Sequence, residues 1–160
     1  MHPMPAEVKA DVRALLPTAD FADAFSFCVD DPSLDAVTAA HRALDRSPGW
    51  VSGLMQLRDL IVRPFGLQTR HDLSLVKVQR IGAFPVLSTT PERVVMGVDD
   101  KHLDFRLAID VARLNDRRRE IVATTLVRTH NLLGRSYLAV ILPFHRRIVP
   151  GIMAQVARRP

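Results

Sequence analysis

Apolar and polar residues alternate in two parts of the chain, and this spacing predicts β-strands there. Phe21, Phe25, Phe27 and Val29 stand at alternate positions and predict a first strand. Alternation returns from Leu73 onward, in segments that turn residues separate from one another. The four strands predicted there lie near Lys77–Ser88, Glu92–Asp99, His102–Leu114 and Glu120–Asn131. Together the segments predict an antiparallel sheet of about five strands.

The predicted strand after Lys101 shows the clearest division between its two faces. Its apolar side carries Leu103, Phe105, Leu107, Ile109 and Val111. Its polar side carries His102, Asp104, Arg106 and Asp110. Because successive side chains of a strand point to opposite faces, one face of the sheet is expected to be apolar and the other to face water. On the water-facing side we expect exposed cross-strand ion pairs.

Between the first strand and the later ones, apolar residues recur at helical spacing. Two short helices are predicted, over residues 31–45 and 47–64. Each begins with a polar residue followed by proline, as Asp31 and Pro32 do in the first helix. The polar side chain caps free N–H groups, and the missing N–H of proline costs nothing at that position.

The last quarter of the chain, Asn131–Arg159, has the spacing of one long amphipathic helix. The apolar arc of its helical wheel holds Tyr137, Leu138, Ile141, Leu142, Phe144, Ile148, Val149, Ile152, Met153 and Val156. Pro143 and Pro150 lie on the other side, where a proline bends the helix axis away from its ring. We therefore expect this helix to curve over the apolar face of the sheet.

The length and composition fit one ordinary globular domain. With 160 residues, 48% of them hydrophobic, the chain has enough apolar side chains for a single core. We expect an N-terminal arm over residues 1–20 and a single domain over residues 21–160. Cys28 is the only cysteine and cannot form an internal disulfide. No signal peptide or membrane span is evident, so we expect a cytoplasmic protein.

Positive charge is concentrated toward the C-terminus. The net charge is +5, and no acidic residue follows Glu120, whereas six arginines do. Such a segment attracts nucleic acid, an anionic membrane surface or an acidic ligand, but a solvated helix face explains the same charge. Without interleaved aromatics or a nucleic-acid module, we expect no nucleic-acid partner.

Four segments resemble a known family. They are HNLLGRSYLAVILPFHRRIVPGIM from His130, RDLIVRPFGL from Arg58, IGAFPVL from Ile81 and GVDDKHLDFRLAI from Gly97. The chain is similar in these segments to the bacterial domain-of-unknown-function family numbered 2867. The resemblance implies an α+β helix-grip fold of the START-like (SRPBCC) type, with an antiparallel sheet wrapped around the C-terminal helix. It also implies a pocket between them for an apolar or amphipathic small molecule.

His145 is the candidate polar residue of such a pocket, because the wheel places it within the apolar arc. The expected lining is Phe105, Leu107, Tyr137, Ile141 and His145. There the imidazole is expected to orient a ligand or to act as an acid or base. The alternative is a core histidine that is hydrogen-bonded to Thr125, to Thr129 or to a backbone carbonyl.

His130 and Arg135 are the candidate rim of the pocket mouth, where Arg135 suits an acidic ligand group. The structural alternative there is that Asn131 caps the helix and Gly134 supplies backbone freedom. We expect no cofactor and no metal, since no clustered His/Cys pattern, phosphate loop or nucleophile motif is present.

Three functional hypotheses remain open. The first is a protein that binds an apolar small molecule by burying its surface, with one or two polar groups that set its orientation. The second is a cyclase, dehydratase or hydrolase on the same fold that uses His145 with a nearby acid. The third is a homodimeric interaction protein without a pocket.

Overall fold

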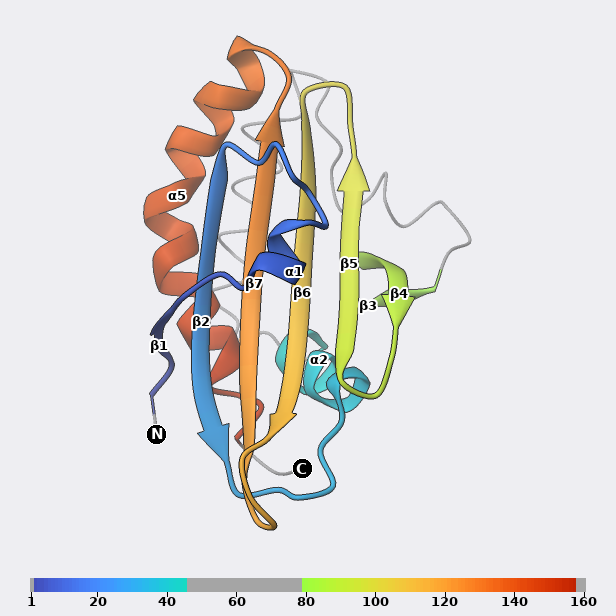
Figure 1. Cartoon of the computed structure of the whole chain (residues 1–160). Coiled ribbons are helices and arrows are strands. Elements are labelled where there is room, and N and C mark those ends of the chain that lie inside the picture. Colours follow the sequence, from blue (N-terminus) through green and yellow to red (C-terminus); the bar gives the residue numbers. More distant parts are fainter. Residues whose placement is uncertain (1, 46–78, 158–160) are drawn as a thin grey trace.

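An antiparallel sheet of seven strands forms the centre of the molecule (Figure 1). The computed structural model describes residues 2–45 and 79–157. The strands are β1 (Met4–Ala6), β2 (Phe21–Val29), β3 (Arg80–Ile81), β4 (Phe84–Thr89), β5 (Arg93–Asp99), β6 (Leu103–Arg113) and β7 (Arg119–Thr129). Their order in the sheet is β1-β2-β7-β6-β5-β4-β3. The first long strand, β2, therefore pairs with the last strand, β7.

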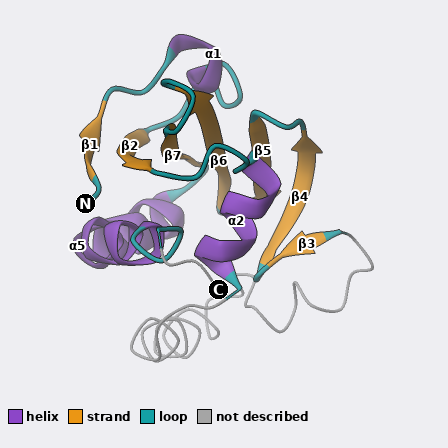
Figure 2. Ribbon diagram, turned by 90° about the horizontal axis from the view of Figure 1, so that it is seen from below, coloured by secondary structure: helices purple, strands orange, loops and turns teal. Residues whose placement is uncertain are grey.

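The helices lie on both faces of the sheet (Figure 2). They are α1 (Ala10–Arg13), α2 (Ala36–Leu44) and α5 (Leu132–Met153). Helices α2 and α5 cover one face, and the short α1 lies on the other. We call these the α5 face and the α1 face. The fold is a mixed α+β arrangement with a long C-terminal helix, as the sequence predicts.

The main core lies between the sheet and the helices of the α5 face. Alternate residues of the central strands supply it, because side chains along a strand point to opposite faces. Its buried members from the sheet are Phe25, Phe27, Val29, Ile81, Val94, Met96, Ile109, Val111, Ile121 and Ala123. The α2 helix contributes four buried alanines, Ala36, Ala39, Ala40 and Ala43. These short side chains let the helix approach the sheet closely.

The number of strands differs from the predicted number. The sheet has seven strands rather than about five. The short edge strand β1 lies in the segment that the sequence presents as an arm. The strand predicted over Lys77–Ser88 is divided by a turn at Gly82 into β3 and β4, and its first two residues lie outside the described part. The helix predicted over residues 47–64 also lies outside it.

The first helix begins later than the prediction places it. Asp35, and not Asp31, is the N-cap of α2, and its carboxylate accepts a 2.7 Å hydrogen bond from the Thr38 backbone N–H. This hydrogen bond holds the pKa of Asp35 below its ordinary value. Asp31 instead accepts hydrogen bonds from Ser33 and pairs with Arg42 at 2.9 Å. It therefore anchors the turn before the helix to the helix itself.

The α1 face is not the open, water-facing surface that the sequence suggests. Val12 and Leu16 are buried there at 1% and 3% exposure, and α1 lies over this face (Figure 2). The cross-strand ion pairs do form, but Asp104 and Asp110 are buried with them at 3% and 8% exposure. An ion pair also holds the N-terminal segment against β5. Asp11 pairs with Arg93 at 2.7 Å, and this contact lowers the pKa of Asp11.

Gly82 is required by the turn between β3 and β4. Its φ of 58° lies in the left-handed region, and a Cβ there would lie 3.0 Å from both the Cβ and the carbonyl oxygen of Leu44. We expect Gly82→Ala to lower the free energy of unfolding by about 1–2 kcal/mol, as measured by urea denaturation. The exposed neighbour Gln79 supplies the control, since Gln79→Ala is expected to change it by less than about 0.5 kcal/mol. Equal stability of the two variants would contradict this account of the turn.

Candidate functional site

A histidine and a carboxylate meet between the sheet and α5. His145 Nε2 lies 3.1 Å from Asp23 Oδ1, and the two side chains are 17% and 20% exposed. His145 comes from the middle of α5 and Asp23 from β2, 122 positions earlier in the chain. The prediction that His145 faces the sheet is confirmed. Its partner, however, is a carboxylate and not the threonine hydroxyl or backbone carbonyl that the structural alternative proposes.

The second oxygen of Asp23 is buried and makes no hydrogen bond to the described part of the chain. Burying a carboxylate oxygen costs free energy unless a donor satisfies it. Asp23 Oδ1 has such a partner in His145, whereas Asp23 Oδ2 has none there. Such an oxygen can accept a hydrogen bond from a hydroxyl or amino group that reaches it.

One aromatic ring packs against the His145–Asp23 pair, and the row of strand residues beside Asp23 is known from the register of the sheet. The Phe21 ring meets the His145 ring edge to face, with centroids 5.8 Å apart and an interplanar angle of 88°. In the sheet, Asp23 stands opposite Thr125 of β7, and Thr125 stands opposite Leu107 of β6. These three residues form one row on the α5 face. With strands about 4.8 Å apart, Leu107 lies about 10 Å from Asp23 along this row.

The five predicted lining residues lie either on the α5 face of the sheet or on α5 itself. Phe105 and Leu107 point to the α5 face of β6, and Phe105 packs against Phe84 with ring centroids 5.4 Å apart. Tyr137 and Ile141 are half-buried on α5, and Ile141 precedes His145 by about one turn. Two of the five thus lie on the α5 face of β6 and three on α5, and His145 is in direct contact with the sheet through Asp23. Their role in ligand binding stays a prediction.

The two predicted rim residues both lie near Asp20, at the start of α5. His130 Nε2 lies 2.9 Å from Asp104 Oδ1, and Asp104 projects from β6 on the α1 face. Arg135 is exposed in the first turns of α5 and lies near Asp20, whose pKa it helps to lower after the larger effect of hydrogen bonds from Thr129. His130 thus belongs to a different cluster from His145, and we leave it out of the proposed site.

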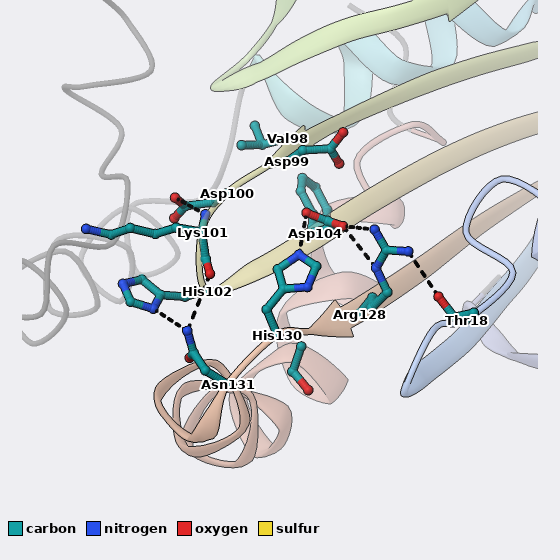
Figure 3. A network of polar contacts seen from close by, with 12 residues as sticks. Thr18, Val98, Asp99, Asp100, Lys101, His102, Asp104, Arg128, His130 and Asn131 are labelled. Carbon is teal, nitrogen blue, oxygen red and sulfur yellow. Dashed lines mark hydrogen bonds and ion pairs between the residues drawn. The ribbon is translucent and has the colours of Figure 1, made fainter.

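This second cluster is built around Asp104 (Figure 3). Its carboxylate accepts hydrogen bonds from Arg128, through Nε at 3.0 Å and through Nη2, and pairs with His130. Arg128 in turn donates to Thr18 at 3.1 Å. Burial opposes ionisation of Asp104, but the hydrogen bonds from His130 and Arg128 outweigh it, so the pKa of this carboxyl lies below its ordinary value. Because Thr18, Asp104 and Arg128 are linked in this way, the cluster joins the N-terminal segment to β6 and β7.

The helix α5 starts where the sequence predicts. Asn131 is its N-cap, and the side-chain oxygen accepts a 3.0 Å hydrogen bond from the Gly134 N–H. The Asn131 amide nitrogen lies 2.9 Å from His102 Nδ1 (Figure 3). Gly134 does not serve backbone freedom, since positive φ among the described residues occurs at Gly82 and not there. It permits close approach, because a Cβ would lie 2.1 Å from the His102 carbonyl oxygen.

Sequence reasoning missed Asp23, although a signal for it was present. In β2 the alternate positions that face α5 are Phe21, Asp23, Phe25, Phe27 and Val29. A carboxylate among four apolar side chains on one face of a strand is costly to bury without a partner. The same reasoning that marks His145 on the apolar arc of α5 also marks Asp23. Because each of the two is a polar residue on an otherwise apolar face, pairing Asp23 with His145 predicts that their side chains make contact.

Two further classes of site find no support in the described residues. The ranges 2–45 and 79–157 contain no group of three or more His, Cys, Asp or Glu side chains placed to hold a metal ion. No helix among them is both long enough and apolar enough to cross a bilayer.

Comparison with known proteins places the chain in a family. The family model described as "Protein of unknown function (DUF2867)" matches residues 15–152. The chain belongs to this family. Membership in DUF2867 confirms the resemblance seen in the sequence, and no curated protein matches the chain. A solved structure described as the crystal structure of a conserved protein from Geobacillus kaustophilus covers 86% of this chain and 93% of its own, at 8% identity and a TM-score of 0.43.

Proposed function

We propose that this member of DUF2867 binds a small amphipathic molecule between the sheet and α5. The His145–Asp23 pair supplies the polar contact, and the surrounding side chains receive the apolar part of the molecule. The observation that carries the proposal is the buried Asp23 Oδ2, which finds no hydrogen-bond donor among the described residues. A molecule with a hydroxyl or amino group satisfies this oxygen, since a carboxylate oxygen accepts hydrogen bonds.

The arrangement of the elements supports the same proposal. A long C-terminal helix lies along an antiparallel sheet, with α2 on the same face (Figure 2). We infer that this is a helix-grip fold of the START-like type, in which ligands lie between the sheet and the C-terminal helix. The lining we propose is Phe105, Leu107, Tyr137, Ile141 and His145, as predicted from the sequence, with Phe21 and Asp23 added from the structure. Ligand sites of this kind are mostly apolar, with a few placed polar groups.

Three probes of equal chain length test the chemistry of the site: octanol, octylamine and octanoate. Binding is followed by NMR, from the chemical shifts of the Asp23, Thr125 and His145 backbone amides. We expect octanol or octylamine to shift these signals and to bind more tightly than octanoate, whose carboxylate would face that of Asp23. We expect Asp23→Asn to weaken this binding tenfold or more, because a hydrogen bond to a charged group is worth about 1.5–3 kcal/mol.

Asp99→Asn is the matched control for this test. Asp99 is also a strand aspartate, but its side chain is 66% exposed and pairs with Arg106. The control variant is expected to bind the probes as the unaltered chain does. Shifts confined to other parts of the chain, or equal binding by Asp23→Asn and the unaltered chain, would show that the site lies elsewhere.

A second candidate function is acid–base catalysis at the same site, and the Asp23 contact favours it. A carboxylate that holds one ring nitrogen orients the imidazole and leaves the other nitrogen for a proton transfer. His145 Nδ1 makes no hydrogen bond to the described part of the chain. A dehydratase or hydrolase on this fold is the corresponding enzyme. Mass spectrometry of any molecule that co-purifies separates the two functions, because an enzyme converts an added sample of it and a binding protein returns it unchanged.

A further inference from the structure

The outer side of α5 exposes apolar side chains to solvent. Among the large hydrophobic residues, Leu132 is 77% exposed, Val140 53% and Phe144 42%. The prediction that Phe144 belongs to the arc facing the sheet is therefore wrong. The exposed positions of α5 are Leu132, Arg135, Ser136, Ala139, Val140, Pro143, Phe144, Arg146 and Arg147. At about 100° per residue they occupy one continuous half of the helix surface. We call these nine residues the outer strip of α5.

The charge of this outer strip has one sign. It carries three arginines, and α5 contains no aspartate or glutamate over its 22 residues. Arg135 lies near Asp20, so Arg146 and Arg147 supply most of the uncompensated charge. Neither of these two arginines forms an ion pair with any residue that the structure describes. The strip therefore combines exposed apolar surface with positive charge that faces outward.

We propose that the outer strip of α5 docks on the surface of an anionic lipid bilayer. Exposed aliphatic and aromatic side chains enter the boundary between headgroups and acyl chains, and the arginines bind the anionic headgroups. The strip from Leu132 to Arg147 is about 22 Å long. The helix lies on the bilayer and does not cross it. This surface is on the other side of α5 from His145, so the inference stands independently of the proposed ligand site.

Charge and composition favour a lipid surface over other occupants. A second copy of the chain, packed strip against strip, would bring six arginines together without a carboxylate from either helix, and like charges repel. A nucleic acid satisfies the arginines, but it leaves Leu132, Val140 and Phe144 without apolar partners. A bilayer with anionic headgroups satisfies both kinds of side chain at once.

Vesicle flotation of the full-length protein tests the proposal. The probes are vesicles of phosphatidylcholine alone and vesicles of equal parts phosphatidylcholine and phosphatidylglycerol. We expect flotation with the phosphatidylglycerol vesicles only, and weaker flotation as salt rises. Arg146→Gln with Arg147→Gln is expected to weaken partitioning about thirtyfold. Val140→Ser with Phe144→Ser is expected to weaken it at least tenfold, because apolar area no longer enters the bilayer.

The control variant is Arg113→Gln with Arg117→Gln, which removes the same charge from the exposed β6–β7 hairpin. It is expected to float as the unaltered protein does, and circular dichroism checks that all variants are folded. The proposal is overturned by absence of flotation, by equal flotation with both vesicle types, or by an equal loss in the control. It is also overturned if an oligonucleotide binds the protein, the arginine variant weakens this binding and the Val140/Phe144 variant does not. A dimer in light scattering that Phe144→Ser dissociates would overturn it as well.

Discussion

Asp104→Asn is expected to lower the free energy of unfolding at pH 7 by about 2–3 kcal/mol. The Asp104 side chain is 5% exposed and accepts hydrogen bonds from both Arg128 and His130. An asparagine keeps the shape but leaves these two donors without a carboxylate in a partly buried setting, and that loss is costly. Urea denaturation, followed by far-ultraviolet circular dichroism, measures the difference.

The pH dependence of this difference has a definite sign. The pKa of Asp104 is lower in the folded protein than the ordinary value of 3.8, so its ionised form stabilises the fold. This contribution is fully present above about pH 4 and is lost as the pH falls through the lowered pKa. The gap between the unaltered chain and Asp104→Asn should therefore become smaller as the pH falls below about 4.

The control for this comparison is Asp99→Asn. Asp99 stands directly opposite Asp104 in the β5–β6 pair and also pairs with an arginine, but its side chain is 66% exposed. Exposed ion pairs contribute about 0–1 kcal/mol, so a small effect is expected. A loss at Asp104 no larger than the loss at Asp99 would contradict the role given to the Asp104 cluster.

Gly134→Ala is expected to destabilise the protein by about 2–3 kcal/mol, although alanine is the better helix former. The gain in helix propensity is about 1 kcal/mol. The Cβ of an alanine at position 134 would lie 2.1 Å from the His102 carbonyl oxygen. This oxygen is a backbone atom, so it moves only if the β5–β6 turn and the start of α5 separate. The steric cost therefore exceeds the gain in propensity. Thermal unfolding gives the net result.

Ser136→Ala is the control on the same helix. Ser136 is exposed, and its hydroxyl donates to the Leu132 carbonyl within α5. Removing that hydroxyl is expected to change the stability by less than about 0.5 kcal/mol. A Gly134→Ala variant as stable as the unaltered chain would mean that the start of α5 is not held against the turn at His102.

Much of the fold follows from local patterns in the sequence. The alternation in β6 defines that strand to within one residue at each end, and the helical spacing defines the start of α5, which Asn131 caps as predicted. The helix ends at Met153, however, before the predicted end at Arg159. Local patterns do not fix short elements. The edge strand β1 has three residues, and the division of β3 from β4 depends on one glycine with positive φ. Their positions are set by pairing with neighbours distant in the chain.

The sequence predicts the position of His145 in the candidate site but not that of its partner Asp23. The helical wheel places His145 against the sheet, and its contact with Asp23 confirms this position. Its partner is 122 positions away and depends on which strand lies under that turn of α5. The order of strands in the sheet, with β2 beside β7, decides this. Strand order comes from long-range pairing, which the spacing of residues along one strand does not encode.

Native mass spectrometry of the freshly purified chain tests directly whether a small molecule lies between the sheet and α5 at the His145–Asp23 pair. The unaltered chain and Asp23→Asn are purified side by side and measured under native and denaturing conditions. We predict a defined extra mass on the unaltered chain that is lost on denaturation and is much reduced in the variant. An equal extra mass on both chains, or bare chains that also fail to bind octanol and octylamine, would contradict it.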